Sequence, residues 1–374
     1  MIYLDSAATT VQKPLRVGNA VHQASLRMST PGRGGHRWAA AAADKAFRCR
    51  ELAASMFGVS GPERVVFTFN ATHGLNMAIR SIVKPQMRVV ISGYEHNAVV
   101  RPLYAIGAKI AVAAGELFSP EAVLDAFARE ITPDTGAVVL NHVSNVFGFV
   151  QPAKEIAALC RERNVPFILD ASQSAGVLPI HLEELGAAFI AMPGHKGLYG
   201  PQGTGILLCG REPEPLLYGG TGSASLSVTM PEDVPDRGEA GTHNMPGIAG
   251  LYEGLLFLES TGIGNIAAHE RRLVRIAAKK LMKIPGVRVF CAENPEHQTG
   301  VLSFAGEKHS PETFGSVLDE AGFALRAGLH CAPLAHKTAG TLPDGTVRMS
   351  VSAFNTPWEI RSFADAALQA EKGK

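Results

Sequence analysis

The sequence predicts an α/β fold with a large domain built on a mostly parallel seven-stranded sheet and a smaller C-terminal α+β domain. Seven short apolar runs lie between residues 64 and 209, and segments with helical spacing separate them. After about residue 245 the pattern changes to long helices and short strands. The chain has 374 residues, whereas single hydrophobic cores stop growing at about 250 to 300 residues. We therefore expect two closely packed domains.

Short runs of β-branched and other apolar residues predict the strands of the large domain. They are RVVFTF from Arg64, RVVIS from Arg88, KIAVA from Lys109, AVVLNHV from Ala137, VPFILDA from Val165, AAFIAM from Ala187 and GILLC from Gly205. Between them, segments such as PAKEIAALCRERN from Pro152 carry apolar side chains at helical spacing. This alternation is typical of a parallel sheet, whose ligand sites lie at the carboxyl ends of the strands.

The large domain is expected over residues 15–245, and the small domain over residues 1–14 and 246–374. The helices and strands expected in the small domain are residues 248–259, residues 266–283 and short strands around Val287, Val301 and Val347. No repeat or long linker separates the two domains, so their boundary rests on this change of pattern alone.

Charge and composition exclude several classes of partner. Lys and Arg number 35 against 34 for Asp and Glu, so no excess positive charge is present to neutralise nucleic acid or an anionic membrane. No run approaches the roughly 18 consecutive apolar residues of a membrane span, and the start, Met1 to Asp5, lacks a basic and apolar leader. We expect a cytoplasmic protein whose ligand is a small molecule.

The cysteines are read as reduced thiols, because none belongs to a CxxC pair. Cys49, Cys160 and Cys209 fall within apolar patterns and are expected in the core, and Cys291 carries no functional signal. Cys331 differs, because it lies in RAGLHCAPLAH between glycine and proline, where a loop is expected.

Small and polar residues follow the predicted strands. Thr72 and His73 come after the first strand and open a helical run, which would present N–H groups to an anion, or Thr72 is simply a helix N-cap. His96 follows the second strand and Asn145 follows the fourth, and each is compatible with a structural role as well as with a ligand contact.

A carboxylate and a lysine follow the next two strands. Asp170 ends the apolar run VPFIL, where it is either a helix N-cap or the partner of a buried cation such as a protonated pyridine nitrogen. Lys196 lies between His195 and Gly197 after an apolar strand. A lysine near a buried site can lose its proton and react with an aldehyde, although most lysines do not.

Together these motifs resemble the class V aminotransferase family of fold-type I pyridoxal-phosphate enzymes, and within it the cysteine desulfurases related to NifS and the selenocysteine lyases. The resemblance runs from IYLDSAATT to VRMSVSAFNTPWEI, essentially the whole chain. The motifs that carry it are ISGYEHNAVV, VSNVFG, ILDASQSAG, GHKGLYGPQG, RGEAGTHN and RAGLHCAP. Each motif is weak alone, but the set is specific.

The resemblance implies a role for each matching residue. Lys196 would bind pyridoxal 5'-phosphate covalently, Asp170 would pair with the pyridinium nitrogen, Gln173 would contact the ring oxygen, and His96 would stack on the ring. Thr72, His73 and His195 would hold the phosphate, with Thr242 supplied by the second subunit of a homodimer. Asn145 and Arg348 would bind the amino-acid substrate, and Arg348 would form a bidentate pair with the carboxylate of the substrate.

The implied activity converts L-cysteine to L-alanine with transfer of sulfur to Cys331 as a persulfide. The sulfur would then pass to a protein acceptor and serve iron–sulfur cluster assembly. A positive charge beside Cys331 would favour its thiolate, and His330 and Arg326 are the nearest candidates in sequence. The alternatives are a selenocysteine lyase, a cysteine sulfinate desulfinase, a class V aminotransferase, or a non-catalytic relative that binds a sulfur-assembly partner.

Three further features qualify the match. Pro193 stands where the family usually has a serine or threonine that binds phosphate, and Gly197 is inserted after the lysine. The cysteine loop is short, like that of the second desulfurase group.

His330, Cys331 and His336 form a possible zinc site, but no second cluster offers a fourth ligand, so we expect no metal.

Overall fold

A seven-stranded sheet forms the centre of the computed structural model, which describes residues 1–32 and 34–372. Its order is β2-β8-β7-β6-β5-β3-β4, and β8 runs antiparallel to both neighbours while the other pairs are parallel. The strands are β2 (Val65–Thr68), β3 (Arg88–Ser92), β4 (Lys109–Ala113), β5 (Thr135–Asn141), β6 (Phe167–Asp170), β7 (Phe189–Pro193) and β8 (Gly205–Cys209). The predicted α/β fold and mostly parallel sheet are confirmed.

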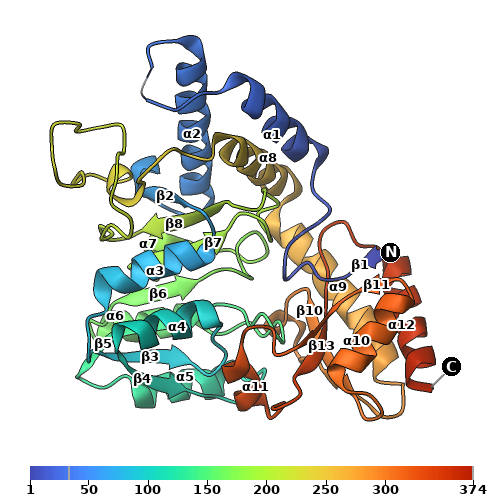
Figure 1. Cartoon of the computed structure of the whole chain (residues 1–374). Helices are drawn as coiled ribbons and strands as arrows, with labels where there is room; N and C mark the ends of the chain where they lie inside the picture. Colours follow the sequence, from blue (N-terminus) through green and yellow to red (C-terminus); the bar gives the residue numbers. More distant parts are fainter. Residues whose placement is uncertain (33, 373–374) are drawn as a thin grey trace.

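Helices cover both faces of this sheet (Figure 1). They are α2 (Arg37–Met56), α3 (Ala71–Ile82), α4 (Asn97–Ile106), α5 (Pro120–Glu130), α6 (Ala153–Glu162) and α7 (Leu182–Leu185), whereas α1 (Leu15–Arg27) packs farther out, against residues 245–261. Leu75 of α3 and Val99 of α4 belong to one hydrophobic cluster with one face of the sheet. Cys49 of α2 and Ile156 of α6 belong to the cluster on the other face. Water is therefore excluded from both faces, as the apolar strand sequences require.

The C-terminal part is built on a four-stranded sheet, with order β12-β13-β10-β9, and on long helices. Its elements are α8 (Met245–Thr261), α9 (Ile263–Leu281), β9 (Val287–Phe290), β10 (Val301–Gly306), α10 (Pro311–Glu320), β11 (Phe323–Ala324), β12 (Arg326–Gly328), α11 (Pro333–Ala339), β13 (Thr346–Ser350) and α12 (Pro357–Lys372). The strands β11 and β12, and β1 (Ile2–Tyr3) at the start of the chain, are only two or three residues long. Runs this short carry no periodic signal in the sequence.

The N-terminal segment lies with the C-terminal part, because β1 pairs in parallel with β11 and Asp5 bridges to Ser350. Helix α8, in contrast, lies beside α1 and α2 (Figure 1). Ile248, Leu251 and Leu255 of α8 are buried in the same cluster as one face of the large sheet. We therefore propose that the domain boundary lies after α8, near residue 262, rather than at residue 245.

The helices were compared with the length and apolar character of a membrane span. Across residues 1–32 and 34–372, none combines the length and the apolar character needed to cross a bilayer.

A buried ion pair fixes the edge of the large sheet. Arg50 on α2 forms two hydrogen bonds to Glu239, from Nη1 at 2.8 Å and from Nη2 at 2.7 Å, and both residues are under 9% exposed. Glu239 also accepts the N–H of Phe67 in edge strand β2 at 2.6 Å. The pair thus joins α2, β2 and the chain that leads to Thr242, where Nε2 of His243 also lies 3.3 Å from Glu239.

Glu239→Ala is expected to lower the free energy of unfolding by about 3 to 5 kcal/mol, because it leaves the Arg50 guanidinium buried without its partner. Glu184→Ala is the matched control, since the Lys154–Glu184 pair has the same 2.7 Å distance but side chains 65% and 55% exposed. Urea unfolding followed by circular dichroism measures both. Equal effects of the two substitutions would contradict the assigned role.

Candidate active site

A cavity of about 100 Å³ opens at the carboxyl edge of the large sheet. The N-terminus of α3, the turn before α4 and the ends of β5, β6 and β7 line it. The predicted site residues that line it are Thr72, His96, Asn145, Asp170, Gln173, His195 and Lys196. Residues more than 120 positions apart in the sequence thus meet where parallel strands end, as expected for this class of sheet.

Lys196 follows β7 and brings an amine into the cavity. Burial, with smaller contributions from the positive charges of Arg348 and Arg326, lowers its pKa to about 8 against the opposing effect of Asp170. Part of the amine is therefore neutral and nucleophilic near neutral pH.

Gly197 allows the lysine loop to lie directly against the turn that follows β6. A side-chain carbon at Gly197 would come 2.3 Å from the carbonyl oxygen of Ala175, and one at Gly176 would come 2.0 Å from the carbonyl oxygen of Gly197. Two backbones approach so closely here that only glycine fits. The additional glycine is therefore a packing requirement of this lysine loop.

Asp170 ends β6 and is 4% exposed. Its Oδ1 accepts hydrogen bonds from the backbone N–H of Ser172 at 2.9 Å and from the Ser172 hydroxyl. The carboxylate caps a turn rather than a regular helix, so the helix N-cap alternative is wrong. Oδ2 accepts no hydrogen bond from the described residues, which leaves it available to a cationic group in the cavity.

His96 is the N-cap residue of α4, and its Nδ1 accepts the N–H of Ala98 at 3.0 Å. Burial lowers the pKa of His96 to about 4, so the ring is neutral under physiological conditions. Because Nδ1 is an acceptor, the proton of the neutral ring resides on Nε2. His96 therefore offers the cavity an uncharged aromatic face and one N–H donor.

These groups fit pyridoxal phosphate. Lys196 offers an amine to its aldehyde, Asp170 a carboxylate to its ring nitrogen, and His96 a face for stacking. Asn70 caps α3 by accepting the N–H of His73 at 2.9 Å, so the Thr72 N-cap alternative is wrong and Thr72 lines the cavity at the positive end of the helix. The buried Nδ1 of His195 has no partner among the described residues.

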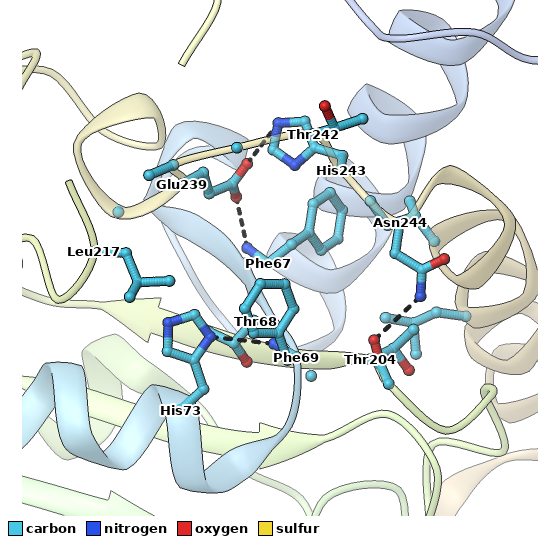
Figure 2. A pocket seen from close by; sticks show the side chains of 17 residues that line it. Phe67, Thr68, Phe69, His73, Thr204, Leu217, Glu239, Thr242, His243 and Asn244 are labelled. Carbon is cyan, nitrogen blue, oxygen red and sulfur yellow. Dashed lines mark hydrogen bonds and ion pairs between the residues drawn. The ribbon is translucent and has the colours of Figure 1, made fainter. Parts of the chain in front are cut away.

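Two predicted phosphate contacts lie in a different pocket of about 40 Å³, shown in Figure 2. The His73 ring stacks on Phe69 at 4.8 Å, and burial lowers its pKa. Thr242 is exposed on the loop after Glu239. Within one chain neither side chain lines the Lys196 cavity, so their phosphate contacts remain predictions, and that of Thr242 requires a second subunit.

Gln173 is held by the N-terminal segment, because its Nε2 donates to the carbonyl oxygen of Ala7 at 3.0 Å. Its Oε1 accepts no hydrogen bond from the described residues. Pro193 ends β7 and also lines the cavity, where it supplies no hydroxyl group. The predicted ring contact of Gln173 remains a prediction.

Asn145 and Arg348 lie in direct contact. Arg348 is 1% exposed and donates from Nη1 to the carbonyl oxygen of Asn145 at 2.9 Å and from Nη2 to Asp5 at 2.5 Å. Its buried Nε has no partner among the described residues. The sequence did not single out Asp5, because its only signal was membership of the IYLDSAATT motif.

Cys331 is exposed on a tight loop next to α4. His330 and Cys331 both have left-handed backbone angles, with φ of 52° and 57°, which are unusual for residues other than glycine. Asn97 donates its N–H to the Cys331 carbonyl oxygen at 2.8 Å, which ties the loop to α4. Cys331 lines a second cavity together with Thr72 and His96, which also line the first one.

Arg326 supplies the positive charge beside this thiol, since its Nη2 lies 3.4 Å from Cys331 Sγ. His330 does not, because burial and the charge of Arg348 lower its pKa to about 2. The His330 Nε2 contacts the Arg326 carbonyl oxygen at 3.1 Å, and its Nδ1 lies 3.4 Å from Nε2 of His336. One tautomer satisfies both contacts, with His330 donating to Arg326 and accepting from His336.

The proposed zinc ligands do not form a cluster. His330 and His336 bond to each other, while Cys331 Sγ contacts Arg326. Among the residues with assigned positions, no group of three His, Cys, Asp or Glu side chains is arranged to hold a metal ion.

Glu95 lies fully buried next to His96 and was not singled out from the sequence. Its Oε1 accepts the Ser92 hydroxyl and the Asn141 N–H, both at 2.8 Å, while Oε2 has no partner among the described residues. Asn141 is the register partner of Asp170 in the sheet. Burial raises the pKa of Glu95 to about 8, so this position holds a neutral carboxyl group at neutral pH.

Comparison with known proteins agrees with this geometry. The chain matches the family described as aminotransferase class-V over residues 2–363. It is 32% identical to a probable cysteine desulfurase of Mycolicibacterium paratuberculosis, over 100% of this chain but 56% of that protein. It is also 32% identical to a probable cysteine desulfurase of Methanothermobacter thermautotrophicus, over 97% of this chain and 93% of that one. The apo structure of a cysteine desulfurase from Thermococcus onnurineus superposes with a TM-score of 0.92 at 30% identity, covering 100% of this chain and 95% of that chain.

Glu95→Gln is expected to make the stability of the folded chain fall less steeply as pH rises. The folded-state pKa of Glu95 is about 8 and the ordinary value is 4.5, so between these values the folded chain binds one more proton at this site than the unfolded chain. Stability from this group is complete below about pH 4.5 and is lost as pH approaches 8. Melting temperatures at pH 5.5 and pH 8 measure it. A variant that loses as much stability over this interval as the wild type would contradict the assignment.

Proposed function

The chain belongs to the aminotransferase class-V family, and from this premise we propose that it is a pyridoxal-phosphate-dependent cysteine desulfurase. It would convert L-cysteine to L-alanine and take the sulfur onto Cys331 as a persulfide. The observation that carries this proposal is the position of Cys331. The thiol lies beside the Arg326 guanidinium and lines a cavity that shares Thr72 and His96 with the Lys196 cavity.

Each residue contributes through chemistry that its surroundings support. When bound, pyridoxal phosphate supplies an electron sink for negative charge that develops at the substrate Cα. Lys196 is the base for the Cα proton, because burial keeps part of its amine neutral. Arg348, whose Nε has no partner among the described residues, would bind the substrate carboxylate.

Sulfur transfer requires a thiolate at Cys331. Its attack on the substrate sulfur forms an S–S bond while the C–S bond breaks, and the electron pair of that bond remains with the substrate carbon, which is protonated to give alanine. Arg326 stabilises the thiolate. The neutral His96 ring, with its proton on Nε2, lines both cavities and would donate this proton.

The exposed positions of Cys331 and Thr242 support two further parts of the proposal. The persulfide is accessible to a protein sulfur acceptor that serves iron–sulfur cluster assembly. Thr242 would contact the cofactor phosphate of a second subunit, in a homodimer that we propose as the active form.

Lys196→Ala is expected to abolish the visible absorbance of bound pyridoxal phosphate, whereas Cys331→Ala should retain it. Cysteine-dependent release of sulfide and alanine, in equal amounts for the wild type, should be lost in both variants. Cys291→Ala is the matched control, because this half-buried cysteine lies outside both cavities.

An active Cys331→Ala variant would contradict transfer through Cys331. Activity on selenocysteine or cysteine sulfinate without activity on cysteine would assign the site to a lyase or a desulfinase instead. Conversion of the cofactor to its amine form by an ordinary amino acid would assign it to an aminotransferase.

Arg326→Gln is expected to slow alkylation of Cys331 by iodoacetamide at pH 7, because the Arg326 guanidinium lies 3.4 Å from Sγ and attracts the anionic form of the thiol that reacts. Arg101→Gln is the control, since Arg101 lines the same cavity without contacting Sγ. Mass spectrometry separates Cys331 from the core thiols, where burial raises the pKa of Cys49 and Cys160 to about 12. Equal rates for both variants would show that Arg326 has no such role.

A further inference from the structure

Another cavity, distinct from the one that Cys331 lines, adjoins Lys196 on the side of the C-terminal domain. Its volume is about 30 Å³, enough for one or two water molecules. The lysine loop, the N-terminal segment, helix α9 and strands β10 and β13 contribute to its wall. Lys196, Ser172 and Gln173 line both this cavity and the larger one. The lysine therefore separates the ligand-sized cavity from a smaller one behind it.

The acidic group of this smaller cavity is Glu270 of α9. Its side chain is 95% buried, at 5% exposure, and no hydrogen bond or ion pair reaches its carboxyl group from the described residues. Its sequence neighbours bond elsewhere, His269 to the carbonyl oxygen of Asn355 at 2.9 Å and Arg271 to Glu296 at 2.6 Å. A buried carboxyl group without a protein partner requires water, a cation or a proton.

Close approach of the backbone directs this carboxyl group. Glu270 Oε2 lies so near Gly300 that a side-chain carbon there would come within 2.5 Å of it. Both residues line the cavity, as does Tyr199, whose hydroxyl accepts the N–H of Ala353 at 2.9 Å. The other wall residues that bear hydroxyl groups are Ser6, Thr10, Ser172, Thr299, Ser350 and Ser352. The wall can therefore orient water between Glu270 and the lysine loop.

We propose that Glu270 is a proton-holding residue for Lys196, and that the two groups exchange a proton through water in this cavity. In the forward step, which starts from the ionised form of Glu270, Lys196 gives up one proton of its ammonium group and the Glu270 carboxylate gains it, so a charged pair becomes a neutral amine and a neutral acid. The reverse step restores both charges. No electrons move, and no co-reactant other than water takes part.

The energetics of the two groups favour such an exchange. Burial raises the pKa of Glu270 to about 8, opposed by Arg271, and burial lowers the pKa of Lys196 to about 8. When a donor and an acceptor have similar pKa values, the transfer between them is nearly balanced in free energy and readily reversed. Among the residues of the cavity wall, Lys196, Tyr199 and Glu270 are the titratable ones, and the raised pKa of Tyr199 keeps its phenol neutral.

The inference rests on the proposed function, in which Lys196 acts as a base, but its test does not need turnover. The apoprotein is labelled with trinitrobenzenesulfonate between pH 6 and 10, and mass spectrometry quantifies the peptide that contains Lys196. Glu270→Gln retains the shape and removes the proton site. The matched control is Glu259→Gln, an exposed residue near the end of α8.

If the groups are coupled, the wild type shows a broad titration of Lys196, because two interacting sites share their protons. Glu270→Gln should narrow it to one step, with labelling at pH 8 raised at least threefold, which corresponds to a shift of about half a pH unit. Gly300→Ala should act in the same direction, because its methyl group displaces the carboxyl group from the cavity while leaving the acid in the chain.

A Lys196 profile that is the same in Glu270→Gln, Gly300→Ala and Glu259→Gln would overturn the inference. If Glu270→Gln does not fold, the Gly300→Ala profile decides. A wild type that releases no sulfide from cysteine would refute the proposed function and leave the labelling result unaffected, so the two failures are distinguishable.

Discussion

Exclusion of water from the carboxyl edge of the large sheet is the constraint on which the chemistry of this chain depends. The same burial lowers the pKa of Lys196 and of His96 and raises the pKa of Glu95 and Glu270. In water at neutral pH, Lys196 would be a cation, His96 would be partly protonated, and both glutamates would be anions. In the fold they are all drawn toward their neutral forms, which are the forms that accept, donate and exchange protons.

This dry edge exists only because the C-terminal part covers it. The N-terminal segment pairs with β11 and bridges to β13, and it brings Asp5 to Arg348 and Ala7 to Gln173. Thr10 of this segment donates its N–H to the carbonyl oxygen of His195 at 3.0 Å, and Gly176 and Gly197 let the lysine loop lie directly on the turn after β6. Stability and reactivity therefore share the same contacts, and a substitution that loosens this segment is expected to change both.

The pattern of apolar residues in the sequence predicted the fold, but it did not predict the protonation states of the site residues. The seven strands were predicted from apolar runs, and the strand ends from which Asp170 and Lys196 project followed from the rule for parallel sheets. The pairing of Arg348 with Asp5 joins residues 343 positions apart, and the buried states of His330, Glu95 and Glu270 depend on neighbours from other elements. No spacing within the sequence encodes such contacts. For the same reason His330 looked like a possible cation in the sequence, whereas the fold makes it neutral.

The opposite environments of Lys196 and Cys331 follow from what each group must do. An amine that acts as a base gains from low dielectric, because burial disfavours its ammonium form. A thiol that acts as a nucleophile loses from burial, because burial disfavours the thiolate, as the raised pKa values of Cys49 and Cys160 demonstrate. Placing Cys331 on an exposed loop, held by Asn97 and paired with Arg326, avoids that penalty and leaves the thiol accessible to a protein acceptor. The left-handed turn at His330 and Cys331 then places the exposed nucleophile on a cavity that shares Thr72 and His96 with the cavity of Lys196.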